Sequence, residues 1–137
     1  MKTLMKSKIL TLATIVTFIF SSCEKDDKIP PTIDFTVVAG YTSADSHIAL
    51  NTAFKIGVDA KRTENKDDLK TFTVTKSYDG AAATTVESVA LTSAQGAEFT
   101  KDYNFVTRNV AGTDKYTFTV TNRDGLITTK SITITVP

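Results

Sequence analysis

The chain has 137 residues, with 16 Lys and Arg against 15 Asp and Glu. This balance leaves no basic field to hold a phosphate backbone, which argues against nucleic acid as a partner. One Cys and one His cannot form a disulfide or supply the usual ligand set of zinc.

The first 22 residues have the pattern of a cleaved signal peptide. Lys2, Lys6 and Lys8 precede an uncharged and mostly apolar run from residue 9 to residue 20. A membrane-spanning helix needs roughly 20 apolar residues, and this run is about a dozen long. We therefore expect residues 1–22 to be removed, which leaves enough chain for one domain.

Small residues and a cysteine follow the apolar run directly, as Ser21, Ser22 and Cys23. They resemble the lipobox of bacterial lipoproteins, in which the Cys thiol is acylated and the signal is cut just before it. The resemblance implies that Cys23 carries the lipid anchor. Two or more acyl chains hold a protein stably on a bilayer, whereas one chain binds only marginally. The alternative is a free Cys behind an ordinary secretory signal.

A lysine and two acids follow the cysteine, as Lys25, Asp26 and Asp27. They resemble the export signal that sends lipoproteins of glycan-foraging Gram-negative gut bacteria to the outer face of the outer membrane. The resemblance implies an outer-membrane lipoprotein that is exposed at the cell surface. The alternative is a solvated, charged tether, because charge runs without apolar partners stay disordered.

Residues 23–31 are the predicted linker, which ends in two prolines that favour an extended exit. The predicted domain occupies residues 32–137. Apolar and polar residues alternate along much of it, as is typical of strands with one buried face. We predict strands near residues 33–37, 54–61, 69–78, 84–91 and 98–107, and a hairpin within residues 112–136. Residues 41–50 are expected to form a polar loop or an irregular edge segment.

About seven short strands, with no helical periodicity after residue 20, predict an all-β, antiparallel β-sandwich. The segment from Gly112 to Val136 resembles the last two strands of immunoglobulin-like and PKD-like domains of bacterial surface lipoproteins. Tyr116 stands where that family has a tyrosine near the start of the penultimate strand. The resemblance implies a single immunoglobulin-like sandwich. The paired cysteines and core Trp of antibody domains are missing from the sequence, so it implies no immune function.

Residues suited to catalysis are scarce in this sequence. His47 lies beside Asp45 and Ser46, and adjacency in sequence does not create the geometry of a catalytic relay. The single thiol, that of Cys23, is committed to lipid if the lipobox resemblance holds. We therefore expect no enzyme activity, no catalytic residue and no cofactor.

Acidic residues gather in one predicted loop, as Glu64, Asp67 and Asp68. Calcium needs only carboxylate and carbonyl oxygens, so these residue types suit it. Lys66 stands among them, however, and the Asp-x-Asp-x-Asp-Gly spacing of a calcium loop is missing. We interpret the segment as a charged loop and predict no metal site, although weak calcium binding stays open.

Tyr41 and Tyr78 are the aromatic residues least tied to a predicted core face, since both lie beside loops. They are the candidate ligand-binding residues if a sugar stacks on this protein; otherwise they pack as partly buried loop rings.

We expect a non-catalytic, lipid-anchored interaction or adhesion module of the cell envelope. The alternative is a glycan-binding accessory lipoprotein of an outer-membrane polysaccharide-uptake system. The expected partners are the membrane, through the anchor, and an envelope protein or a glycan.

Overall fold

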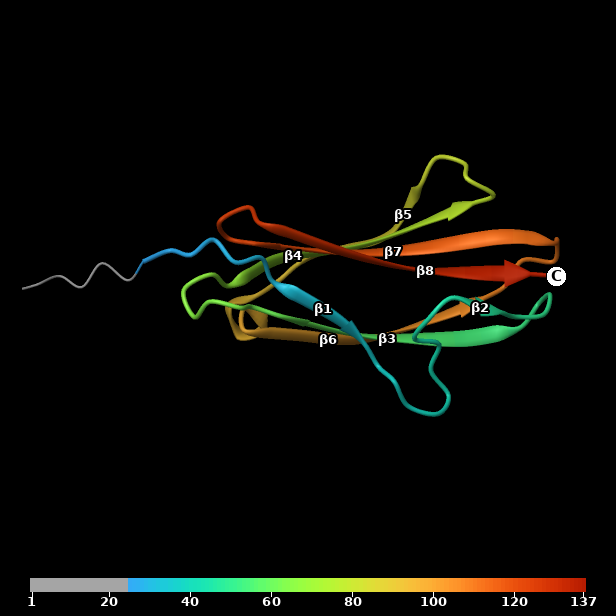
Figure 1. Cartoon of the computed structure of the whole chain (residues 1–137), viewed down its shortest axis with the longest axis horizontal. Coiled ribbons are helices and arrows are strands. Elements are labelled where there is room, and N and C mark those ends of the chain that lie inside the picture. The colour runs from blue at the N-terminus through green and yellow to red at the C-terminus, as the bar shows by residue number, and fades with distance from the viewer. Residues whose placement is uncertain (1–24) are drawn as a thin grey trace, which may run out of the picture.

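The computed structural model describes residues 25–137, which form two β-sheets packed face to face (Figure 1). The three-stranded sheet has the order β1-β3-β6, and the five-stranded sheet has the order β2-β8-β7-β4-β5. The predicted all-β sandwich is therefore confirmed. The predicted signal peptide and Cys23 lie outside the described residues.

The strands agree closely with the predicted ranges. They are β1 (Thr32–Phe35), β2 (Ser46–His47), β3 (Ala53–Lys61), β4 (Leu69–Tyr78), β5 (Thr84–Ala90), β6 (Glu98–Val106), β7 (Gly112–Asn122) and β8 (Ile127–Val136). A short 3-10 helix, η1 (Ser93–Gln95), precedes β6. Within the described residues, no helix is long and apolar enough to cross a membrane.

Period-two alternation decides which side chains enter the core. In β3, Ile56, Val58 and Ala60 are buried between the sheets, while the side chain of Asp59 points outward to Lys61. In the same way β7 buries Tyr116 and Phe118. A shift of one residue in either strand would expose all of these side chains, so the hydrophobic pattern fixes the register.

Aromatic rings fill the centre of the core. The ring of Phe72, which is fully buried, lies with its centroid 5.0 Å from that of Phe99 and 6.4 Å from that of Phe118. The ring of Tyr116 lies 4.3 Å from that of Phe105. These contacts join β4 and β7 of one sheet to β6 of the other, so they hold the two layers together.

The segment that we expected to be a polar loop or an irregular edge contains β2. This strand pairs in parallel with β8, through Ser46 and His47, in a sandwich whose other pairings are antiparallel. Ile48 N–H continues the ladder by donating to the carbonyl oxygen of Thr135 at 3.0 Å. The short strand covers part of the edge of β8, which would otherwise offer unpaired backbone groups.

The strands run lengthwise, so the connections gather at two ends of the sandwich (Figure 1). The linker enters at one end, which also holds the β3–β4 loop and the β7–β8 turn. The opposite end holds the C-terminus, the β2–β3 and β6–β7 connections and the β4–β5 turn. We call these the linker end and the distal end.

Candidate functional site

The linker is hydrogen-bonded to the domain. The backbone N–H groups of Asp27 and Ile29 donate to Oε1 and Oε2 of Glu64, each at 3.1 Å. The hydroxyl of Thr63 donates to the carbonyl oxygen of Pro30 at 2.7 Å, and that of Thr128 donates to the carbonyl oxygen of Pro31. The β3–β4 loop and β8 therefore hold the linker from both sides.

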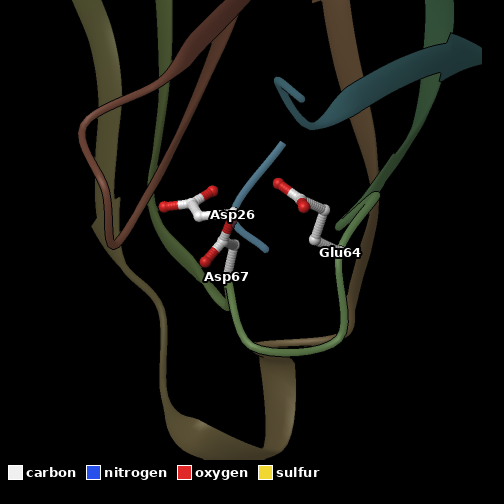
Figure 2. Close-up of side chains that lie close together, drawn as sticks. All are labelled: Asp26, Glu64 and Asp67. Carbon is white, nitrogen blue, oxygen red and sulfur yellow. The ribbon is translucent and has the colours of Figure 1, made fainter. Parts of the chain in front are cut away.

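Three carboxylates meet at this junction. One oxygen each from Asp26, Glu64 and Asp67 lies within 4.8 Å of the others. Figure 2 shows the carboxylates of Asp26 and Glu64 on either side of that of Asp67. Asp124, in the β7–β8 turn, lies within hydrogen-bonding reach of Asp26. We call Asp26, Glu64 and Asp67 the acidic junction.

Of the three carboxylates, that of Asp67 has the least favourable environment for a negative charge. It is 3% exposed, and its Oδ2 has no hydrogen-bond partner among the described residues. Burial raises the pKa of Asp67 first; the contact with Glu64 and the negative charges of Asp124 and Asp26 raise it further. The N–H groups of Ile29 and Asp27 instead hold the pKa of Glu64 below its usual value.

Asp68 does not belong to this group, although it is next to Asp67 in sequence. Its carboxylate binds Arg62 Nη1 at 2.5 Å and lies 3.8 Å from Arg123 Nη2. The three acids of the predicted charged loop therefore do not form one group. Glu64 and Asp67 lie together, and the third carboxylate of the junction is that of Asp26. Nothing in the sequence pattern could reveal this, because Asp26 is brought there by the fold of the linker.

The predicted ligand-binding residue Tyr41 packs on the outer face of the three-stranded sheet. A Cβ on Gly57 would lie 2.8 Å from Cε1 of Tyr41, so the ring lies directly over this glycine. The Tyr41 hydroxyl donates to Oδ2 of Asp102 at 2.7 Å, which raises the pKa of Tyr41. Lys55 Nζ lies 5.0 Å from the ring centroid.

An open depression of about 500 Å³ adjoins this surface. It is lined by Thr36, Val58, Asp59, Thr100, Lys101 and Asp102. Asp102 is shared between the depression and the hydrogen bond of Tyr41, so the ring lies at its border.

The second predicted ligand-binding residue, Tyr78, ends β4 near the distal end. The guanidinium carbon of Arg108 lies 4.4 Å from its ring centroid. Arg108 also binds Oδ2 of Asp79 at 3.0 Å and Oδ1 of the buried Asp114 at 2.6 Å. The β1–β2 segment and the β4–β5 turn lie on opposite sides of the sandwich (Figure 1), so Tyr41 and Tyr78 do not form one stacking platform.

The residues around His47 have local structural roles. Oδ1 of Asp45 accepts the backbone N–H of Thr133 at 2.8 Å, and the hydroxyl of Ser46 donates to the carbonyl oxygen of Ala44 at 2.8 Å. His47 itself is exposed in β2, where it pairs with Thr135 of β8. These bonds fix the edge of the five-stranded sheet.

Sequence reasoning missed the apolar surface of the distal end. Leu50, Val106 and Val110 are 41%, 61% and 63% exposed, on the β2–β3 connection, the last residue of β6 and the β6–β7 connection. The Nδ2 group of Asn51 donates to Oδ1 of Asn109 at 2.7 Å and joins these connections. Isolated apolar residues in loops carry no periodic signal, so only the folded chain brings them to one end.

No family model and no curated protein sequence matches the chain. Among solved structures, the sandwich is similar to a superoxide reductase (neelaredoxin) from Ignicoccus hospitalis, with a TM-score of 0.54, 9% identity, and coverage of 80% of this chain and 81% of that chain. A β-glucosidase from Listeria innocua in complex with glucose gives a TM-score of 0.45 and 13% identity, over 77% of this chain and 16% of that chain. At such identities the likeness concerns the fold alone.

Proposed function

We propose that this protein is a non-catalytic, lipid-anchored interaction or adhesion module, exposed on the outer membrane and contacting an envelope protein. The arrangement of the two ends carries the proposal. The linker enters at one end, and Leu50, Val106 and Val110 are exposed at the opposite end. An anchor before the linker would direct these apolar side chains away from the bilayer, and exposed apolar surface is typical of protein contact sites.

The polar groups beside Tyr41 and Tyr78 support the non-catalytic part of the proposal. Tyr41 bonds to Asp102, while Arg108 binds both Asp79 and Asp114. Catalysis requires a nucleophile and a base within hydrogen-bonding reach, or two carboxylates with different tasks. The groups named here are instead engaged in bonds that stabilise the fold.

Metabolic labelling with a fatty-acid analogue tests the anchor. We expect label on the wild-type chain and none on Cys23→Ser, because the thiol is the proposed point of attachment. Protease added to intact cells should cleave the wild-type domain if it is exposed. An unlabelled wild-type chain, or a chain that is cleaved only after lysis, contradicts this part of the proposal.

Cross-linking on intact cells tests the contact surface. We expect Val110→Asp to reduce cross-linking to an envelope protein severalfold, because a charge at the distal end would have to be desolvated in the contact. Ile127→Asp is the matched control, since Ile127 is 59% exposed at the linker end. Equal loss in both variants, or no loss in either, would reject the distal surface. Retention on a polysaccharide that depends on Tyr41 or Tyr78 would instead support the glycan-binding alternative.

A further inference from the structure

We propose that the acidic junction, Asp26, Glu64 and Asp67, is a calcium site that fastens the linker to the domain. The site does not depend on the lipid anchor or on the distal contact surface. Its ligands come from the linker and from the β3–β4 loop. A bound cation would therefore join two segments that are far apart in sequence.

The spacing of the oxygens fits one ion. Two oxygens that bind the same calcium ion at about 2.3–2.6 Å lie at most about 5.2 Å apart. One oxygen from each of the three carboxylates lies within 4.8 Å of the others, so every pair is inside this limit and small side-chain movements suffice for one ion to contact all three. Calcium accepts six to eight oxygen ligands in a flexible geometry, and water can complete such a set.

The buried oxygen of Asp67 is the independent sign of a missing partner. Buried polar atoms are almost always hydrogen-bonded, because an unpaired one loses its hydration without compensation. Oδ2 of Asp67 has no partner among the described residues, and its carboxylate lies between two other carboxylates (Figure 2). Ionised carboxylates only accept hydrogen bonds, so these neighbours cannot satisfy it while all three are charged. A cation can.

The local balance of charge also favours a cation. Asp124 adds a fourth carboxylate beside Asp26, and its negative charge also acts on Asp67. Lys66 and Lys28 are the positively charged side chains that act on Asp26. Four acids thus face two lysines, while Glu64 receives two backbone N–H groups. The negative charges of Asp124, Asp26 and Glu64 all act on Asp67, which is almost fully buried.

Calcium titration of the full chain in detergent, after treatment with a chelator, tests the site. We expect saturable binding of one ion by calorimetry, with a dissociation constant of about 10⁻⁴–10⁻³ M, as in extracellular calcium modules. Saturating calcium should raise the thermal midpoint by roughly 5–10 °C. Magnesium should raise it much less, because it demands tighter octahedral geometry and dehydrates reluctantly.

Two variants remove ligands in different ways. Asp67→Asn should melt at a higher temperature than the wild type in the absence of calcium, because it removes the crowded buried charge, and it should gain nothing from calcium. Asp26→Asn lies in the linker outside the core, so the sandwich folds as before, and calcium affinity should fall about tenfold or more. Asp34→Asn is the control: its exposed carboxylate binds Lys130 at 2.9 Å, away from the junction.

Hydrogen exchange gives a second readout. Calcium should slow the exchange of the N–H groups of Asp27 and Ile29, which already bind Glu64, and should slow the exchange of the core strands only as far as it raises the global free energy of unfolding. No saturable binding up to about 10 mM calcium, well above the affinity of such modules, overturns the proposal. So does a calcium effect that persists in Asp67→Asn. An equal response to magnesium overturns the assignment to calcium.

Discussion

Gly57 controls how the outer face of the three-stranded sheet is covered. A Cβ at this position would lie 2.4 Å from Oγ1 of Thr36 and 2.8 Å from the ring of Tyr41. Atoms cannot approach so closely, so the segment after β1 packs there only because residue 57 lacks a side chain. The position of Tyr41, a candidate ligand-binding residue in the β1–β2 segment, therefore depends on a glycine of β3.

We predict that Gly57→Ala lowers the free energy of unfolding by about 1–3 kcal/mol, the usual cost of overpacking. Urea denaturation measures the loss. Tyr41→Ala in the same chain should recover part of it, because the variants share one contact and are therefore not additive. Additive losses would show that the ring does not meet the new methyl group.

At the residue scale, the sequence predicts which side chains are buried better than it predicts which side chains contact one another. Period-two alternation correctly places Tyr116 and Phe118 in the core, since burial follows from the hydrophobic pattern. The alternation does not predict that Asp26 lies near Glu64 or that Tyr41 bonds to Asp102, because the courses of the linker and of the β1–β2 segment decide these contacts. The binding roles of Tyr41 and Tyr78 stay predictions.

The edge strands β5 and β6 belong to different sheets and are joined by one acidic side chain. Glu87 of β5 accepts hydrogen bonds from Lys101 Nζ at 2.6 Å and from the Tyr103 hydroxyl at 2.8 Å, both on β6. The bond to Lys101, followed by that to Tyr103, holds the pKa of Glu87 below its ordinary value of 4.5. The ionised carboxylate therefore stabilises the folded state.

A lowered pKa gives this link a defined pH dependence. Its contribution to stability is fully present above pH 4.5, the ordinary value, and is lost as the pH falls through the lower pKa of the folded state. We predict that Glu87→Gln lowers the free energy of unfolding by about 1 kcal/mol at pH 7, allowing for its partial exposure. The difference from the wild type should shrink progressively as the pH falls below 4.5.

Denaturation at several pH values between 3 and 7 measures this difference. Glu98→Gln is the control, because Glu98 pairs with Lys61 at 3.2 Å on the outer surface and does not join the two sheets. A loss for Glu87→Gln that is the same at every pH would mean that packing, and not charge, accounts for it.

At the element scale, the long strands were predictable and β2 was not. Strands such as β4 and β7 have enough residues for apolar and polar positions to alternate visibly. A two-residue strand has no period, and its pairing with β8 is decided by where the β1–β2 segment crosses the edge of the sheet. The sequence also could not predict that the linker packs against the domain, because the linker binds Glu64 through backbone N–H groups, which carry no sequence signal.

The sandwich has one core, so its two sheets should unfold together. Phe72 of β4 is fully buried and contacts Phe99 of β6 and Phe118 of β7. We predict that Phe72→Ala costs about 3–5 kcal/mol, the usual range for a buried aromatic side chain. Hydrogen exchange should show protection falling by similar amounts in β3 and β8, one strand from each sheet. A loss confined to β4 and its direct neighbours would show that the sheets open independently.

The position of the linker also has a mechanical consequence. A partner that pulled on the distal end against a fixed N-terminus would load the molecule along its strands, because the two points of attachment lie at opposite ends (Figure 1). The two bonds to Glu64 would carry the load first, then the bonds of Thr63 to Pro30 and of Thr128 to Pro31, and then the four residue pairs between β1 and β3. Those pairs would be stressed in shear, all at once, which resists tension better than opening them one after another. The linker end would then resist tension in series with the proposed anchor.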